Sequence, residues 1–334
     1  MIKTCVAVKS AGDTQGDGVE TGGRPLRMVA RCRLRSAHSA LLLLLLTGEA
    51  EAAGAEDDAA ALQGVLKGLR KSGSYGRLKG SWRSGTDPCA AGGWEGVTCD
   101  EAGESIIGLD LSYLSLEGTL APEVGELRKL TTLKLDGNKL SSTLPDSIGK
   151  LAELRKLSAR GSKFTLPLPA ALPACTALTT LDLSAGMFIG EFPDVLYSLS
   201  SLSRLSLGRN ALNGTLSHDL CELRELQHLD LAHNEVEGSL PSCIGDLAGM
   251  EFLSLKDNRV SGTIPASLAT VAPLKHLDLS GNSLHGHIPE AFGVLDMDIF
   301  QLVGNSNLDP PDPAGPLAGV MSKRKLHAGK NRLN

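Results

Sequence analysis

The sequence predicts an α/β solenoid, a fold in which similar short coils of chain stack side by side. Three observations predict it. A pattern of 24 residues recurs eight times, without an insertion, between residues 106 and 297. Apolar residues make up 42% of the 334 residues but aromatic ones only 3%, which favours an aliphatic core. The 38 glycines and 16 prolines indicate a chain that turns often.

Charge and hydropathy exclude two classes of function. The net charge of −5 argues against nucleic-acid binding as the main activity. The longest strongly apolar run, residues 40–46, is far shorter than the roughly 20 residues of a membrane-spanning helix. We therefore expect no nucleic-acid partner and no transmembrane segment.

Residues 1–55 are predicted to be an upstream extension and a secretory signal peptide. Three arginines at 31, 33 and 35 precede the apolar run Leu41–Leu46, and small residues follow at 50–55. This order of basic, apolar and small segments is typical of a signal peptide, and it has a normal length when counted from Met28. Met28 is therefore the predicted start. The alternative is an Ala- and Gly-rich tail with no role in export.

The repeats begin at a fixed apolar residue, and positions 1, 4 and 6 of each are apolar throughout. Alternation at positions 4 and 6, as in Leu229 and Leu231 around Asp230, predicts a short strand with one buried face. Because one strand cannot bury its face alone, stacked coils must share a continuous core. The first residues are Ile106, Leu130, Leu154, Leu178, Leu202, Leu226, Met250 and Leu274.

Three polar or special positions predict the turns. Asparagine at position 9 can donate and accept hydrogen bonds inside the coil, where a sharp turn leaves backbone groups unpaired. Glycine at position 13 allows a tight backbone, and proline at position 16 needs no amide hydrogen. The asparagines are Asn138, Asn210, Asn234, Asn258 and Asn282, the glycines Gly118, Gly190, Gly214, Gly238, Gly262 and Gly286, and the prolines Pro145, Pro169, Pro193, Pro241, Pro265 and Pro289.

On these residues the chain resembles the plant-type extracellular leucine-rich-repeat family, which includes receptor-like proteins, receptor kinase ectodomains and polygalacturonase-inhibiting proteins. The resemblance covers residues 106–297. It implies a curved array with a concave parallel sheet, a second short strand on the flank of each coil, and ligands that dock on the concave face.

Residues 56–105 resemble the family's N-terminal cap. Leu62, Val65, Leu66 and Leu69 lie on one helical face within residues 56–72. Two tryptophans and two cysteines follow, and the resemblance implies a disulfide between Cys89 and Cys99, which fits an oxidising compartment. The alternative is two reduced, buried thiols.

Other cysteines depart from the simple pattern. Cys175 occupies a core position and is predicted to be a buried thiol. Cys221 and Cys243 stand at positions 20 and 18 of adjacent coils, around the limit for a disulfide, and similar pairs occur in receptor-like proteins. A disulfide between them and two small core residues both stay open.

Repeat 3 and the C-terminal segment are degenerate. Ala159, Ser162 and Leu166 replace the core leucine, turn asparagine and glycine of repeat 3, which indicates either a re-angled point or neutral drift. Residues 298–334 are predicted to be a degenerate C-terminal cap and a disordered basic tail. The family has a cysteine where this chain has Asp309, so no disulfide is expected there.

The concave face is the predicted site. Positions 3, 5, 7, 8 and 10 point outward, and position 3 places an exposed Phe252 about 5 Å from His228 and from His276. Exposed aromatic rings flanked by charges are typical anchors for a partner. A second basic group is Lys156, Arg160 and Lys163; the alternative is an ordinary solvated sheet. The predicted ligand-binding residues are Arg204, His228, Phe252, His276, Arg209, His233 and Lys256.

Signals for catalysis are weak. His228 and Asp230 share a strand face but lack a nucleophile, and His285 with His287 lacks a third metal ligand. We expect no enzyme activity, no cofactor and no metal. Asn213, in Asn213-Gly214-Thr215, is the predicted glycosylation acceptor.

The sequence therefore predicts a secreted or cell-surface interaction protein, receptor-like in function. The resemblance implies a protein, peptide or glycan ligand on the concave face, with a receptor kinase as a further partner. The first alternative is an inhibitor of an extracellular enzyme such as a polygalacturonase, and the second is an intracellular scaffold.

Overall fold

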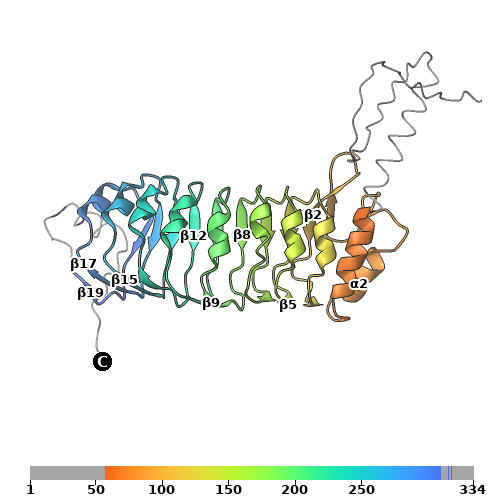
Figure 1. Ribbon diagram of the computed structural model, residues 1–334, viewed down its shortest axis with the longest axis horizontal. Coiled ribbons are helices and arrows are strands. Elements are labelled where there is room, and N and C mark those ends of the chain that lie inside the picture. Colours follow the sequence, from red (N-terminus) through yellow and green to blue (C-terminus); the bar gives the residue numbers. More distant parts are fainter. Residues whose placement is uncertain (1–56, 310–314, 316, 318–334) are drawn as a thin grey trace, which may run out of the picture. The chain divides into compact units, whose positions relative to one another are not determined.

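The computed structural model describes residues 57–309, together with residues 315 and 317. The predicted signal peptide, the start at Met28 and most of the predicted basic tail lie outside the described residues. Within residues 57–309 the chain forms a row of coils that follow one another in sequence order (Figure 1).

One strand from each coil joins a continuous ten-stranded sheet. Except for β1, which is antiparallel to β2, neighbouring strands are parallel. Their register repeats from coil to coil, so that Leu205 pairs with Leu229 and Leu229 with Leu253. In order, the strands are β1 (Val97–Cys99), β2 (Ile106–Asp110), β4 (Thr132–Lys134), β6 (Lys156–Ser158), β8 (Thr180–Asp182), β10 (Arg204–Ser206), β12 (His228–Asp230), β14 (Phe252–Ser254), β16 (His276–Asp278) and β18 (Ile299–Gln301).

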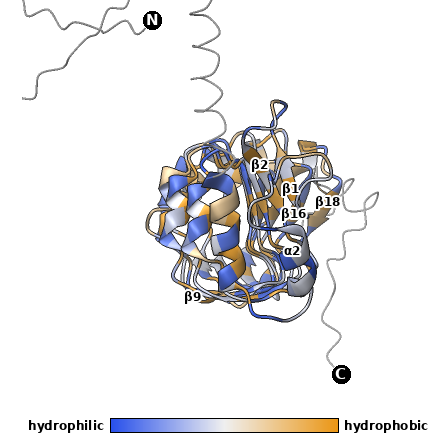
Figure 2. Cartoon of the chain, turned by 90° about the vertical axis from the view of Figure 1, so that its right-hand side faces the viewer, coloured by the Kyte–Doolittle hydropathy of each residue, from blue (hydrophilic) through white to orange (hydrophobic). Residues whose placement is uncertain are grey.

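Each coil returns through a short flank strand and a 3₁₀ helix. The 3₁₀ helices lie on the side away from the ten-stranded sheet (Figure 2). They are η1 (Pro122–Glu126), η2 (Asp146–Lys150), η3 (Leu172–Ala174), η4 (Asp194–Ser198), η5 (His218–Glu222), η6 (Ser242–Asp246), η7 (Ala266–Thr270) and η8 (Glu290–Val294). The flank strands are β3 (Glu117–Gly118), β5 (Lys139–Ser142), β7 (Lys163–Phe164), β9 (Ile189–Glu191), β11 (Ala211–Asn213), β13 (Glu237–Ser239), β15 (Arg259–Gly262), β17 (Ser283–Gly286) and β19 (Asn307–Leu308).

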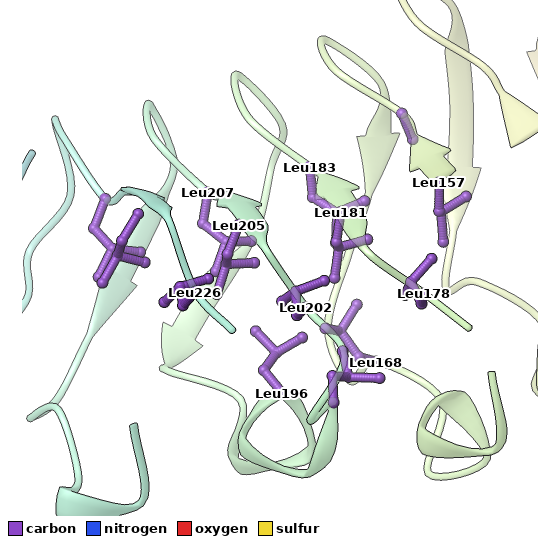
Figure 3. Packing of buried hydrophobic residues seen from close by; sticks show 14 of the residues in the cluster. Leu157, Leu168, Leu178, Leu181, Leu183, Leu196, Leu202, Leu205, Leu207 and Leu226 are labelled. Atoms are coloured by element: carbon purple, nitrogen blue, oxygen red, sulfur yellow. The ribbon is translucent and has the colours of Figure 1, made fainter. Parts of the chain in front are cut away.

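Leucines fill the interior of the coils. Leu181 and Leu205, from adjacent strands, point inward and are fully buried together with Leu202 and Leu196 (Figure 3). Burial of one leucine side chain stabilises the fold by about 1.5–3 kcal/mol. The same contacts recur in every coil, which is why the apolar positions of the repeat are invariant and why aromatic residues are few.

The turn asparagines form a ladder inside the array. Asn234 donates from Nδ2 to the carbonyls of Leu231 in its own coil and Leu207 in the preceding coil, both at 3.0 Å. Its Oδ1 accepts from the Leu212 amide at 3.0 Å. These three bonds satisfy buried backbone groups, as the sequence predicts. The ladder lacks its amide in repeats 1, 3 and 4, where Leu114, Ser162 and Gly186 stand at this position.

The N-terminal cap covers the first coil. Residues 57–68 are helical, and Leu62 and Val65 of this helix are fully buried. A second helix, α2 (Tyr75–Ser81), leads to Trp82, whose ring stacks on Trp94 with the ring centroids 6.1 Å apart. Because each coil has an apolar edge, this cap keeps the first one from water.

A disulfide joins Cys89 to Cys99, with the two Cα atoms 5.8 Å apart. Cys99 ends β1, which pairs with β2 of the first repeat, so the disulfide ties the cap loop to the sheet. Cys175 is a buried free thiol, and burial raises its pKa to about 11.

The sheet continues for one strand beyond the eighth predicted repeat. Met297, Phe300 and Leu302 are buried as the apolar residues of the repeats are, and Asn305 extends the asparagine ladder. Oδ2 of Asp309, which stands where the family has a cysteine, lies 3.0 Å from Nδ1 of His287. A polar contact thus links the last two coils at this position.

The flank strands do not form one sheet. They form groups of three (β3, β5, β7), two (β9, β11) and four (β13, β15, β17, β19), and the first interruption lies between Phe164 and Ile189. Here Leu166 replaces the glycine of the repeat, and Pro167 has no amide hydrogen to donate. The ten-stranded sheet runs unbroken past this point, since β6 pairs with both β4 and β8.

Candidate functional site

The outward side chains of β12, β14 and β16 form a column of three stacked rings. His228, Phe252 and His276 stand at the same position of successive repeats and pair in register. The centroid of the Phe252 ring lies 4.0 Å from that of His228 and 4.1 Å from that of His276. The ring planes differ by 14° and 25°, so the three rings are nearly parallel. We call these residues the ring column.

The ring column corrects one expectation. The sequence predicts an exposed Phe252, but the residue is half-buried because an imidazole covers each face of its ring. The column therefore presents ring edges, rather than the face of one ring, to solvent. A partner would meet a narrow apolar strip rather than a single protruding side chain.

The two histidines of the column favour the neutral form. Burial, the Arg204 guanidinium and His276 lower the pKa of His228 to about 4, against an opposing effect of Asp182. The pKa of His276 is also lowered, because the effect of burial outweighs the opposing effects of the Asp278 and Asp230 carboxylates. Uncharged imidazoles stack on Phe252 without a cost for desolvating a charge.

The aspartates beside the ring column bind the backbone of their own turns. The Oδ1 of Asp230 accepts from the Ala232 amide at 3.0 Å, and the Oδ1 of Asp278 accepts from the Ser280 amide at 3.0 Å. No hydrogen bond joins Asp230 to His228 in the described chain. The arrangement fits a structural role for these carboxylates and gives no acid–base pair.

Three cationic side chains lie around the ring column without a carboxylate partner. Arg204, in β10, pairs in register with His228 and is exposed. Arg209 is exposed on the turn after β10, and Lys256 is half-buried on the turn after β14. None of the three forms an ion pair within residues 57–309. Their charges are therefore available to a ligand.

His233 differs from these cations. Its Nδ1 lies 3.1 Å from Oδ2 of Asp257 on the next turn. The seven predicted residues lie in β10, β12, β14 and β16 or on the turns that follow these strands, and His233 contacts Asp257, which occupies the same position of the next repeat.

The turn after each concave strand carries a signal that sequence reasoning missed. Position 8 has a positive φ in every repeat, because its amide turns to donate to the next coil, as Arg209 does to the Ala232 carbonyl at 2.7 Å. Four coils have glycine there, but five have side chains that are strained in this conformation. The glycines are Gly137, Gly161, Gly281 and Gly304, and the others are Tyr113, Ala185, Arg209, His233 and Asp257.

Three of the five strained side chains lie beside the ring column. Arg209, His233 and Asp257 follow three successive strands, β10, β12 and β14. Backbone strain of this kind persists where the side chain has a use. The repeat arithmetic already puts these three residues at the same outward position, but it does not show that their backbone is strained.

The second predicted basic group is not one patch. Lys156 lies in β6 of the ten-stranded sheet, and Arg160 lies on the turn that follows it. Lys163 lies in β7, which belongs to the flank strands. The three cations therefore do not share one sheet.

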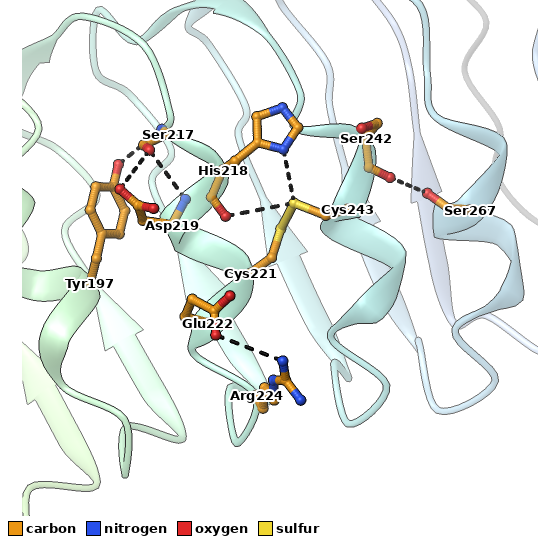
Figure 4. Close-up of a disulfide and its surroundings, with 10 residues drawn as sticks. All are labelled: Tyr197, Ser217, His218, Asp219, Cys221, Glu222, Arg224, Ser242, Cys243 and Ser267. Carbon is orange, nitrogen blue, oxygen red and sulfur yellow. Dashed lines mark hydrogen bonds and ion pairs between the residues drawn. A yellow bond between two sulfur atoms is a disulfide. The ribbon is translucent and has the colours of Figure 1, made fainter.

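A second disulfide lies away from the concave face. Cys221 of η5 is bonded to Cys243 of η6, with the Cα atoms 6.0 Å apart (Figure 4). The His218 Nδ1 lies 3.5 Å from Sγ of Cys243. The disulfide joins two neighbouring coils, where the sequence left both a bridge and two thiols open.

The remaining predicted features lie elsewhere. Asn213 ends β11 on the flank and is half-buried. His285 and His287 gain no third metal ligand, and the described residues contain no group of three His, Cys, Asp or Glu that could hold a metal ion. No helix in the described part of the chain is long and apolar enough to span a membrane.

Comparisons with known proteins agree with this architecture. Residues 176–236 match the family Leucine rich repeat, residues 129–151 and 273–295 match Leucine Rich Repeat, and residues 55–100 match the Leucine rich repeat N-terminal domain. An 80-residue stretch is 42% identical to LRR receptor-like serine/threonine-protein kinase SIK1 of Oryza sativa subsp. japonica, over 24% of this chain and 8% of that protein. The chain thus matches less than a tenth of that relative's length.

Two solved structures are similar over longer stretches. The plant peptide hormone receptor RGFR1, in complex with RGF2, is 32% identical with a TM-score of 0.53, over 55% of this chain and 30% of that chain. A plant ice-binding protein is 26% identical with a TM-score of 0.63, over 81% of this chain and 93% of that chain. With its repeats, cap and disulfides, this chain is a leucine-rich-repeat protein of the plant extracellular type.

Proposed function

We propose that the chain is an extracellular, non-enzymatic recognition module that binds a peptide on its concave face, in a receptor-like role. The ring column of His228, Phe252 and His276 is the observation that carries this proposal. Buried aromatic and arginine side chains dominate the binding energy of most protein interfaces. The ring column, with Arg204 beside it, offers both in four adjacent strands.

The chemistry of the surface favours a peptide with an apolar side chain near carboxylates. The ring edges offer an apolar strip, and the imidazole nitrogens can bond to a peptide backbone. Arg204, Arg209 and Lys256 would pair with carboxylates of the ligand. RGFR1, which is similar to 55% of this chain over 30% of its own, is described as a peptide hormone receptor, and this supports a peptide as the ligand class.

A displayed random-peptide library, selected against the full chain, tests the proposal. Arg204→Glu/Lys256→Glu reverses two unpaired charges on the concave face and should weaken the selected peptides by at least about tenfold, or 1.4 kcal/mol. Lys67→Glu/Lys79→Glu makes the same charge change on exposed residues of the cap and is the matched control. That variant should bind as the wild type does.

Equal binding of the selected peptides to the wild type and to the concave variant would refute the concave site. Inhibition of a polygalacturonase by the chain, with no peptide selected, would instead favour the alternative of an enzyme inhibitor. Alkylation of Cys89 and Cys99 as free thiols in protein from its native source would favour the intracellular scaffold, because such disulfides form in oxidising compartments.

The proposed extracellular role includes the predicted division of the chain. Residues 1–55 would be removed on export, 56–105 would cap the array, 106–297 would carry the ligand, and 298–334 would close it. The mature N-terminus, measured by mass spectrometry, tests export: a start near Ala53 or Glu56 is expected, and a start at Met1 or Met28 would contradict it.

A further inference from the structure

The flank of repeat 4 exposes two large apolar side chains. Ile189 is 69% exposed and Met187 51% exposed. They stand two residues apart and beside the interruption between β7 and β9. Contiguous exposed apolar surface favours association between molecules unless something covers it. We call Met187 and Ile189 the flank patch.

The glycosylation acceptor lies on the same surface. In the β9–β11 pair, Ile189 is opposite Ala211, and Glu191 is opposite Asn213. Leu212 is fully buried, so its neighbours Ala211 and Asn213 point outward, as do Ile189 and Glu191. With strands about 4.8 Å apart and about 3.3 Å per residue, the Cα atoms of Asn213 and Ile189 are roughly 8 Å apart.

The acceptor side chains are not engaged elsewhere. Asn213 is half-buried, its side chain has no hydrogen-bond partner within the described residues, and Thr215, whose hydroxyl completes the acceptor, is exposed. Gly214 between them has a φ of +77°, which turns the chain at the end of β11. No hydrogen bond within residues 57–309 therefore has to break before the amide nitrogen can react.

We propose that Asn213 carries an N-linked glycan that covers the flank patch. Nδ2 of Asn213 bonds to the anomeric carbon of a lipid-linked oligosaccharide, the diphospholipid leaves, and one amide proton is released. The C–H faces of the first sugars then pack on Ile189 and Met187, and their hydroxyls face water. The attached glycan keeps this flank from associating with other molecules, while the concave face stays open.

This proposal rests on the proposed extracellular role, and one experiment separates the two. The full chain is fused behind a cleavable secretion leader and produced in plant cells. Mass spectrometry of the peptide that contains Asn213, before and after enzymatic release of the glycan, should show full occupancy. Asn213→Gln and Thr215→Ala both remove the acceptor, and Asn307→Gln, an exposed asparagine outside any acceptor, is the matched control.

Binding of the fluorescent dye ANS measures the exposed apolar surface. Both acceptor variants should bind severalfold more ANS than the wild type and the control, and Ile189→Ser in the Asn213→Gln background should restore the low signal. An unoccupied Asn213, or equal ANS binding with and without the glycan, would overturn the proposal. Binding of the library-selected peptides is measured on the same samples. If neither the glycosylated wild type nor any variant binds them, the proposed concave site is refuted, while the glycan proposal still depends only on occupancy and ANS binding.

Discussion

The Nδ1 atom of His233 lies 3.1 Å from Oδ2 of Asp257, although both residues have the left-handed backbone conformation that four other coils leave to glycine. Arg209 has the same conformation on the preceding turn. The turns beside the ring column thus hold charged side chains where the fold would be more stable with none.

Arg209→Gly is expected to stabilise the fold and weaken binding. A left-handed conformation costs a residue with a Cβ about 1–2 kcal/mol, and the extra unfolded-state entropy of glycine offsets about 0.5–1 kcal/mol. The free energy of unfolding in urea should therefore rise by up to about 1.5 kcal/mol. Gly161→Ala, at the same position and with no atom closer than 3.9 Å to the added Cβ, is the control and should destabilise. A destabilised Arg209→Gly would show that this side chain supports the fold.

Phe252→Ala is expected to separate binding from stability. Loss of two ring contacts should cost about 1–3 kcal/mol, whereas Leu253→Ala, at the next residue but inside the core, should cost about 2–5 kcal/mol. Library-selected peptides should lose affinity for Phe252→Ala even where urea titration shows it to be fully folded. Unchanged peptide affinity would remove the ring column from the site.

The stability of the wild type should fall as the pH is lowered from 6.5 to about 4. The pKa of His228 is about 4 in the folded chain and 6.5 ordinarily, so in this window the unfolded chain binds a proton that the folded chain rejects. Thermal unfolding of the wild type and of His228→Gln at several pH values measures this contribution. His228→Gln should lose less stability than the wild type over this pH range. His285→Gln is the control for replacing a histidine. Parallel curves for the wild type and His228→Gln would contradict the prediction.

Ser162→Asn is expected to restore the asparagine ladder in repeat 3. The new amide can donate to the preceding coil and accept from a backbone amide, as Asn138 does in repeat 2. Stability in urea should rise by about 1 kcal/mol. Asn234→Ala, which removes the hydrogen bonds of that amide to both coils, should lower it by at least as much. Equal stability of Ser162→Asn and the wild type would mean that the repeat 3 turn cannot accept an amide.

Removal of the Cys221–Cys243 disulfide should act locally. Cys221→Ser/Cys243→Ser is expected to cost about 2–4 kcal/mol, and because coils contact only their neighbours, the loss should concentrate around η5 and η6. Hydrogen exchange should quicken there and stay unchanged in β2 and β4. A uniform increase along the array would contradict this local role.

The constant repeat length explains how much of the candidate site could be predicted from the sequence. Position arithmetic places His228, Phe252 and His276 in adjacent strands because every coil has the same length. It cannot say that the rings face one another, since spacing fixes Cα positions and not rotamers. The expectation of an exposed Phe252 was wrong for this reason.

Other features needed the backbone itself. In the sequence, the left-handed turn is indicated only by the glycine that recurs at this position, at Gly137, Gly161 and Gly281. The repeats between them carry other residues there, so the pattern is easily overlooked. The sequence marks repeat 3 as degenerate, but it does not say which of the two sheets loses its pairing. The structure resolves this: the flank strands separate there and the ten-stranded sheet does not.

The gap between β7 and β9 has a mechanical consequence. Elsewhere along most of the array, two coils part only when bonds break on both the concave face and the flank, but between repeats 3 and 4 the flank contributes none. The fewest backbone hydrogen bonds would therefore have to break when the coils separate at this boundary. Tension on the chain would divide it into a cap-bearing segment and a segment that keeps the ring column whole.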